Sequence, residues 1–529
     1  MARHTSHQPD LQKASSPLGE MLFVAAPVVA TMASYTVAQF IDGLMVSRLG
    51  EGALSAQGNG AVIAFVPIAI MMGLFGVINT YVSQSLGAGS PRRGTAYPWN
   101  GVWMGIIAWL AVMVPMAIFL RPLSVDMPRI LAEWVGHIGI DVSVSAPNPE
   151  VIENQLAYAR ILLLGAIFTL SARAMSHFFF GMHAPMVVMV ATVIGSLVNV
   201  GMNWLLIFGN LGFPELGVPG AALGTVIGSA VEWIIPFVIF LGPKLNAKYG
   251  TRSTWRPSLK RMREILKIGW PAGVMFGNEL ICWAIMMAGL IGTISVADNE
   301  AAWIGLRYMH LSFMPAVGMS VAVTAIVGRC IGSGRPDLAV KRAWLGMGVT
   351  MVYMGACAGA FMLFREQLVG FFISDQHSPE MTAEILRIGA LVMICAALFQ
   401  VFDAIGITMM GALRGAGDTV VPGVFAAVAS WVLIILGGWM MKRLFPELGS
   451  LGPWIAASVY IIVFAVFMLV RFQRGGWRSI RLLGDEESRP DTESGDMAVP
   501  ALSLSGAPPM ADFEEQARDR AGKSCREPS

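Results

Sequence analysis

Two segments of the chain are closely similar, VSQSLGAGSP (Val82–Pro91) and VGRCIGSGRP (Val327–Pro336), and the second lies 245 residues after the first. Trp99 and Trp344 are separated by the same interval. A repeat of this kind predicts two structurally similar halves.

A second pair of segments indicates where the halves differ. FPELG occurs at Phe213 and again at Phe445, so the spacing here falls to 232 residues. The first half therefore carries a short insertion, and we expect it in the polar stretch that begins at Arg121.

The composition points to a membrane protein. Of the 529 residues, 55% are hydrophobic and only 13% are charged, and the mean hydropathy is +0.64. Apolar runs recur along most of the chain, and about 20 apolar residues are enough to cross a bilayer as a helix. The fold class predicted is an all-α integral membrane protein.

The apolar runs, divided at turn and charge signals, predict twelve transmembrane helices in two six-helix lobes. Because six is even, both lobes enter the membrane from the same side and are parallel. The expected starts lie near residues 20, 53, 97, 156, 186, 217, 264, 301, 340, 388, 420 and 451. The expected organisation is a leader at 1–19, an N-lobe at 20–243 with an enlarged external loop at 121–155, a basic linker at 244–263, a C-lobe at 264–474 and a disordered tail at 482–529.

Basic residues are unevenly divided between the two sets of loops. The richer set includes Arg92, Arg93 and the basic segment from Lys244 to Lys267. By the positive-inside rule this set, the leader and the tail are cytoplasmic. We expect a multi-pass protein of the inner (plasma) membrane.

Three carboxylates inside apolar spans are candidates for function, since burying one in a helix centre costs about 2.5–3.5 kcal/mol on insertion scales. They are Asp42, Glu279 and Asp403. For Asp42, an interfacial ion pair with Arg48 is a strong alternative. A structural hydrogen bond is the alternative for the other two.

Polar and aromatic neighbours extend this set. Asn199 and Asn203 are four residues apart and share one helix face. Their amides either line a cavity or form hydrogen bonds to a neighbouring helix. Phe399 has the same spacing from Asp403, and an aromatic face beside a carboxylate suits an organic cation. Core packing is the alternative for Phe399.

Several other classes of function lack their sequence signals. No phosphate-binding loop, G-x-S-x-G elbow or H-E-x-x-H pair occurs, and the five cysteines have no metal-site spacing. The net charge of +2 gives no indication of nucleic-acid binding. We therefore expect neither an enzyme nor a cofactor or metal. We also expect a monomer, although no motif bears on the oligomeric state.

The residues resemble the multidrug and toxic compound extrusion (MATE) family, from about Glu20 to Arg474. The segments that carry the resemblance are FIDGLMVSRLG, VSQSLGAG, LVNVGMNWLLIFG, GWPAGVMFGNE and ALFQVFDAIGITMMGALRGAGD. Resemblance to its NorM-type branch implies an ion-driven exporter of small organic cations or amphiphiles, exchanged for sodium ions or protons by alternating access.

The resemblance also assigns roles to the marked residues. It places the cation-site carboxylates at Glu279 and Asp403, the helix-1 Asp at Asp42 and the helix-5 amides at Asn199 and Asn203. Sodium-coupled members carry a Tyr four residues before the helix-10 Asp, and here that position is Phe399. Proton coupling and sodium coupling therefore both stay open.

Two other functions remain as alternatives. A lipid-linked precursor flippase of the same superfamily would be expected to have a more cationic cavity. A non-transporting scaffold or receptor would leave the buried carboxylates unexplained.

Overall fold

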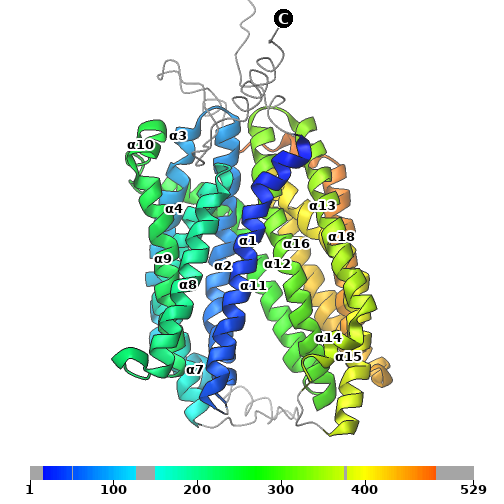
Figure 1. Ribbon diagram of the computed structural model, residues 1–529. Coiled ribbons are helices and arrows are strands. Elements are labelled where there is room, and N and C mark those ends of the chain that lie inside the picture. The colour runs from blue at the N-terminus through cyan, green and yellow to red at the C-terminus, as the bar shows by residue number, and fades with distance from the viewer. Residues whose placement is uncertain (1–15, 51, 127–148, 374–377, 484–529) are drawn as a thin grey trace, which may run out of the picture. The chain divides into compact units, whose positions relative to one another are not determined.

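The structure is a computed structural model that describes residues 16–50, 52–126, 149–373 and 378–483, and these ranges contain helices and no strand (Figure 1). They belong to one compact unit, Ser15–Asp491. Twelve helices in the described part are long and apolar enough to cross a membrane, which confirms the predicted number.

Each half contributes six of these spans. The spans of the first half are α1 (Pro17–Val46), α2 (Ala53–Gly87), α4 with α5 (Ala96–Ala108 and Val114–Ile118), α7 (Pro149–Gly181), α8 (Pro185–Phe208) and α9 (Val218–Leu241). Those of the second half are α11 (Leu259–Ala284), α12 (Val296–Gly332), α13 (Pro336–Leu363), α15 (Pro379–Ala416), α16 with α17 (Val420–Ala429 and Gly437–Leu444) and α18 (Leu451–Gln473). Short helices α3 (Pro91–Gly94), α10 (Pro243–Tyr249) and α14 (Arg365–Gly370) lie between them.

The helix boundaries follow local chemistry. The Ser16 hydroxyl accepts the Gly19 N–H at the start of α1, and Ser378 does the same for Met381 at the start of α15. Such side chains satisfy N–H groups that have no partner within the helix. At the other end of α15, Gly417 has φ 90°, a conformation that stops a helix and that glycine adopts readily.

Two helices begin seven or more residues earlier than predicted, because proline suits the first helical position even where the first turns are polar. α7 begins at Pro149 instead of near 156, and α15 at Pro379 instead of near 388. The end of the expected loop at 121–155 is therefore helical, and Arg121 pairs with Glu153 at 2.6 Å. Residues 127–148 of that loop lie outside the described residues.

The expected linker at 244–263 is also partly helical, since it includes most of α10 and the start of α11. Most of the leader and the tail beyond residue 483 lie outside the described residues.

The spanning helices form two bundles, the N-lobe and the C-lobe (Figure 1). α1 packs against both α8 of its own lobe and α12 of the other, while α11 packs against α2.

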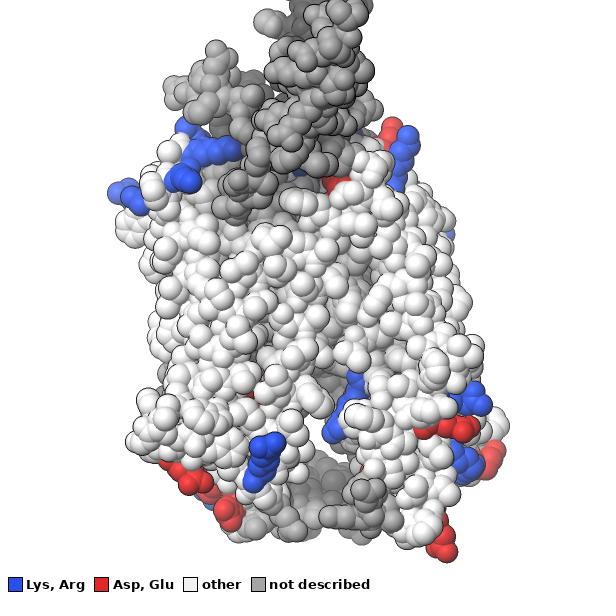
Figure 2. Space-filling model, in the orientation of Figure 1, with Lys and Arg blue, Asp and Glu red and all other residues white. Residues whose placement is uncertain are grey.

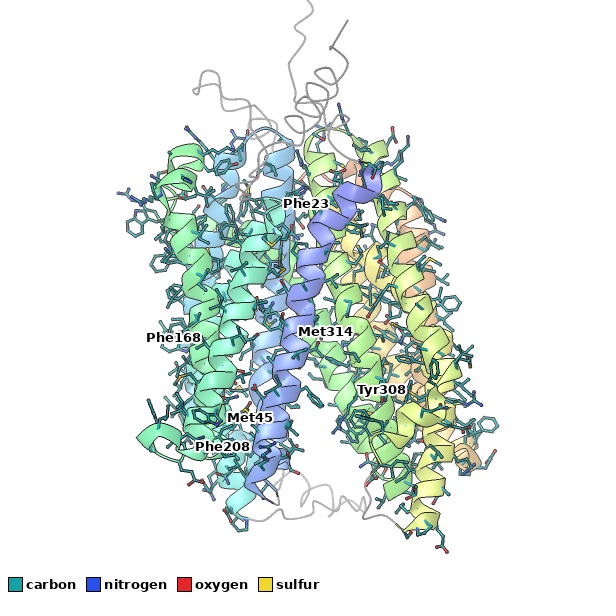
Figure 3. All side chains as sticks on the ribbon, viewed as in Figure 1. Phe23, Met45, Phe168, Phe208, Tyr308 and Met314 are labelled. Carbon is teal, nitrogen blue, oxygen red and sulfur yellow. The ribbon has the colours of Figure 1, made fainter. Side chains whose placement is uncertain are left out.

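Exposed apolar side chains such as Phe23, 68% exposed, cover the outside (Figure 3). Charged side chains gather toward the two ends and leave a broad uncharged band between them (Figure 2).

The repeated segments join the lobes where α2 and α12 end. A Cβ on Gly87 would lie 2.1 Å from the Arg329 carbonyl oxygen, and one on Gly332 would lie 2.0 Å from that of Gln84. The two contacts are related by the same 245-residue interval as the repeat. We call Gln84–Gly87 with Arg329–Gly332 the glycine crossing. At the opposite end of the bundles, Figure 2 shows a hollow between them.

Candidate functional site

The C-lobe brings two of the predicted carboxylates together. Glu279 on α11 lies within electrostatic range of Asp403 on α15. Asp403 is only 8% exposed, yet neither carboxyl group hydrogen-bonds or pairs with another described residue. Their oxygen atoms are therefore available to a small cation or a proton.

A third residue of this C-lobe site, Tyr460 on α18, has no signal in the sequence. It is 3% exposed and lies within electrostatic range of both Glu279 and Asp403. A tyrosine in an apolar run is neutral and unremarkable, so only the packing of α18 against α15 reveals it. Tyr460 places a hydroxyl near the pair, where Phe399 cannot supply one.

Hydrogen bonds beside Glu279 fix the orientation of α11. Asn278 donates to the Ser430 hydroxyl at 2.8 Å and accepts from the Trp431 indole N–H at 2.6 Å. Cys282 also contacts the Ser430 hydroxyl, at 3.5 Å. These contacts hold the α11 turn that carries Glu279 against the segment following α16.

The N-lobe brings the remaining predicted polar residues together. The Asn203 side-chain amide donates to Asp42 Oδ1 at 2.6 Å. With the Asn199 amide oriented to satisfy its neighbours, its nitrogen donates to the same oxygen at 2.9 Å and its oxygen accepts the Thr225 N–H at 3.1 Å. Arg48 is exposed and pairs with no described carboxylate, so the alternative ion pair with Asp42 is not formed.

A fourth intramembrane carboxylate, Glu232 on α9, escaped the sequence reasoning. It is 9% exposed, and both Tyr35 and Thr192 donate hydrogen bonds to its Oε1. It could have been found from the sequence, because Glu232 lies in the apolar segment GSAVEWIIP. A carboxylate inside an apolar span is a candidate for function, as it was for Asp403.

Phe399 is fully buried in the core of the C-lobe. The next residue, Gln400, donates to the Ser312 hydroxyl at 2.7 Å. Phe399 therefore packs among apolar side chains, and its contact with a substrate stays a prediction.

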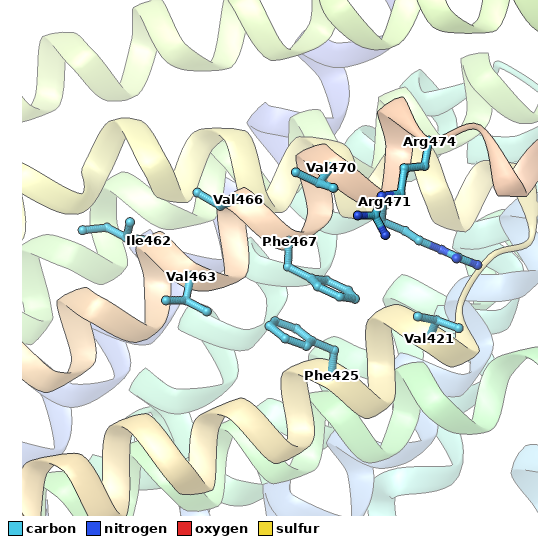
Figure 4. Close-up of a pocket in the computed structure, with 9 residues that line it drawn as sticks. All are labelled: Val421, Phe425, Ile462, Val463, Val466, Phe467, Val470, Arg471 and Arg474. Atoms are coloured by element: carbon cyan, nitrogen blue, oxygen red, sulfur yellow. The ribbon is translucent and has the colours of Figure 1, made fainter.

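One cavity lies away from these carboxylates. It has a volume of about 590 Å³ and lies between α16 and α18, where the Phe425 and Phe467 rings stack with centroids 3.6 Å apart (Figure 4). Several of its lining valines are exposed, among them Val466 at 50%. This cavity belongs to the outer, apolar face of the C-lobe.

Within the described residues, no group of three or more His, Cys, Asp and Glu side chains could hold a metal ion. The polar sites are instead acids and amides inside the two helical bundles. The described residues form twelve spans in two bundles, and each bundle holds buried carboxylates that pair with no described cationic residue. These features define a multi-pass membrane transporter.

Comparison with known proteins identifies the family. The family model named MatE matches residues 27–126 and 279–440. Two similar curated proteins are the probable multidrug resistance proteins NorM of Thermotoga maritima, 27% identical over 88% of this chain and 94% of that protein, and of Pseudomonas putida, 27% identical over 89% and 96%. The chain belongs to the multidrug and toxic compound extrusion (MATE) family.

Solved structures show the same fold. A MOP superfamily transporter from Pyrococcus furiosus has a TM-score of 0.75 at 18% identity and covers 88% of this chain and 98% of its own. A eukaryotic MATE transporter has a TM-score of 0.73 at 17% identity and covers 87% and 96%. The all-α, twelve-helix, two-lobe prediction is thus confirmed.

Proposed function

We propose that the protein exports small organic cations or amphiphiles in exchange for protons or sodium ions. The observation that carries this proposal is the C-lobe pair, Glu279 and Asp403. Two carboxylates within electrostatic range of each other in an apolar bundle, neither paired with a described cationic residue, favour binding of a positive charge. The names of the NorM relatives support multidrug compounds as the substrate class.

The proposed mechanism is alternating access between the lobes, with the C-lobe pair as the coupling site. Asp42, Asn199 and Asn203 form the substrate-facing site of the N-lobe. A coupling ion that binds in the C-lobe cancels one of the negative charges of Glu279 and Asp403, so the pair attracts a cationic substrate less strongly. Ion and substrate therefore compete, and the ion gradient drives the substrate out.

The same proposal assigns a conformation to the structure. The end that carries α3 and α10 holds Arg92, Lys244 and Lys248, so it faces the cytoplasm by the positive-inside rule. The glycine crossing closes this end, and the hollow at the other end faces outward (Figure 2). The arrangement is then outward-open, in a monomer embedded in the plasma membrane with both termini cytoplasmic.

The test is efflux of a fluorescent organic cation from proteoliposomes, driven in turn by a sodium gradient and by a pH gradient. The wild type should export with at least one gradient, and Asp403→Asn should abolish export while still inserting in the membrane. Glu384→Gln, an exposed change on the same helix, is the matched control and should export normally. Full export by Asp403→Asn would contradict the role of the pair.

One observation favours the flippase as a second candidate function. Arg173 on α7 and Arg414 on α15 both act electrostatically on His177, and neither forms an ion pair with a described acid. A cluster of this kind suits an anionic headgroup. Failure of both gradients to drive cation efflux, with translocation of a lipid-linked pyrophosphate in the same vesicles, would favour it.

A further inference from the structure

Glu232 takes part in neither of the sites proposed above. It is the only titratable side chain on α8 and α9. Thr192 Oγ1 donates to its Oε1 at 3.0 Å, and the Tyr35 hydroxyl donates to the same oxygen. No described Lys, Arg or His forms an ion pair with Glu232.

The position of Glu232 repeats the geometry of the Asp42 site. Polar side chains from three helices form two layers, and each helix contributes one residue to each layer. The two residues on a given helix are seven positions, or about two turns, apart. The first layer is Asp42 of α1, Asn199 of α8 and Thr225 of α9, and the second is Tyr35, Thr192 and Glu232 of the same helices.

The layers lie about 10 Å apart along the helices, at 1.5 Å per residue. α1 and α8 run in one direction and α9 in the other, so all three helices place the second layer on the same side of the first (Figure 1). That side is the one toward the glycine crossing. A proton that enters from the hollow would therefore meet Asp42 before Glu232.

The partners of Glu232 suit a proton better than a metal ion. Tyr35 and Thr192 both donate to Oε1, and they can keep donating to it when Oε2 carries a proton, because a carboxylic acid retains acceptor capacity. The Thr192 hydroxyl also lies 3.4 Å from that of Tyr35, which leaves the three oxygen atoms already in mutual contact. A metal ion would have to separate them, whereas a proton needs no extra space.

Few other charges face the two layers. On α7, Tyr158 lies near Asp42, and the Arg173 guanidinium stacks 4.5 Å above the Tyr35 ring with His177 one turn further on. On α2 the one titratable group is Tyr81, whose hydroxyl donates to the Glu264 carbonyl. α10 carries Lys244, Lys248 and Tyr249 beyond the end of α9.

We propose that Glu232 is a second proton-binding site of the N-lobe, two helical turns from Asp42, with Tyr35 and Thr192 as its hydrogen-bond partners in both charge states. The proton adds to the carboxylate oxygen Oε2 and leaves from the same atom, so no other bond changes. The proposal deepens the proposed function, since it adds a proton to those available for exchange with substrate.

The test is pH-dependent infrared difference spectroscopy of the full-length protein in liposomes without substrate. The wild type should show a carboxylic-acid carbonyl band that appears on acidification. Glu232→Gln should lose one component of this band, and Glu215→Gln, an exposed control, should retain it. An unchanged band in Glu232→Gln would overturn the proposal.

Two further variants keep the test decisive if Glu232→Gln does not fold. Tyr35→Phe and Thr192→Val each remove a hydrogen bond and should shift a component of the band to higher frequency. Identical spectra in both variants and the wild type would overturn the proposal. A Glu232 band in a protein that exports no cation would instead contradict the proposed function and leave the proton site standing.

Discussion

Replacing Gly332 with Ala should open the glycine crossing and shift the balance between the two arrangements of the lobes. A Cβ at Gly332 would lie 2.0 Å from the Gln84 carbonyl oxygen, and its counterpart at Gly87 would lie 2.1 Å from the Arg329 carbonyl oxygen. Both obstacles are backbone atoms, so no side chain can rotate away. The helices themselves must separate.

The size of the effect follows from this geometry. A carbon and a carbonyl oxygen are in comfortable contact at roughly 3.3 Å, so the helices must separate by about 1 Å at this point. Overpacking of this kind typically costs about 1–3 kcal/mol. If this cost applies only to the arrangement with a closed crossing, the ratio of the closed to the open arrangement falls about 5- to 150-fold.

The assay is double electron–electron resonance between spin labels at Arg92 and Arg335, both exposed beside the crossing, in a background without other cysteines. Gly332→Ala and Gly87→Ala should each lengthen the main distance. Gly348→Ala is the control, because nothing lies within 4 Å of its added Cβ. A distance distribution that is the same in Gly332→Ala and the control would show that the added Cβ does not separate the helices at the glycine crossing.

Three further predictions concern the polar contacts. Tyr460→Phe keeps the ring but removes the hydroxyl near Glu279, and ion-driven efflux should fall while the amount of inserted protein, measured by immunoblot, is unchanged. Asn203→Ala removes the 2.6 Å hydrogen bond to Asp42 and should lower the unfolding free energy by about 1–3 kcal/mol, seen as a lower melting temperature in detergent; an unchanged melting temperature would argue against the bond. Arg471→Met leaves the buried Asp418, now 2.8 Å from the Arg471 guanidinium, without its partner and should destabilise the protein by about 3 kcal/mol, whereas the double variant with Asp418→Asn should recover most of that loss.

The spans were predictable because the bilayer imposes a simple rule on composition. Helices expected near residues 53, 420 and 451 begin at Ala53, Val420 and Leu451. The starts of α7 and α15 were placed too late, because hydropathy marks the part of a helix inside the membrane and not its polar first turns. Proline at the first position, as at Pro149 and Pro379, was the available signal.

The candidate sites were only partly predictable. Asp42, Asn199 and Asn203 stand out as polar residues in apolar runs, and the structure brings them into one hydrogen-bonded group. Glu232 could have been found by the same rule. Tyr460 could not, because a neutral aromatic residue in an apolar span carries no sign of what lies beside it.

Twelve membrane spans in two related halves follow from the order of the amino acids, because hydrophobic length and an internal repeat are properties of the chain alone. Which polar residues meet depends on the folded bundles. Asp42 accepts a hydrogen bond from Asn203 instead of pairing with Arg48. Glu279 lies near Asp403 and Tyr460. The repeated glycines lie against the backbone of the opposite lobe. Such pairings depend on how helices rotate and pack against one another, and residues far apart in sequence do not specify this until the bundles form.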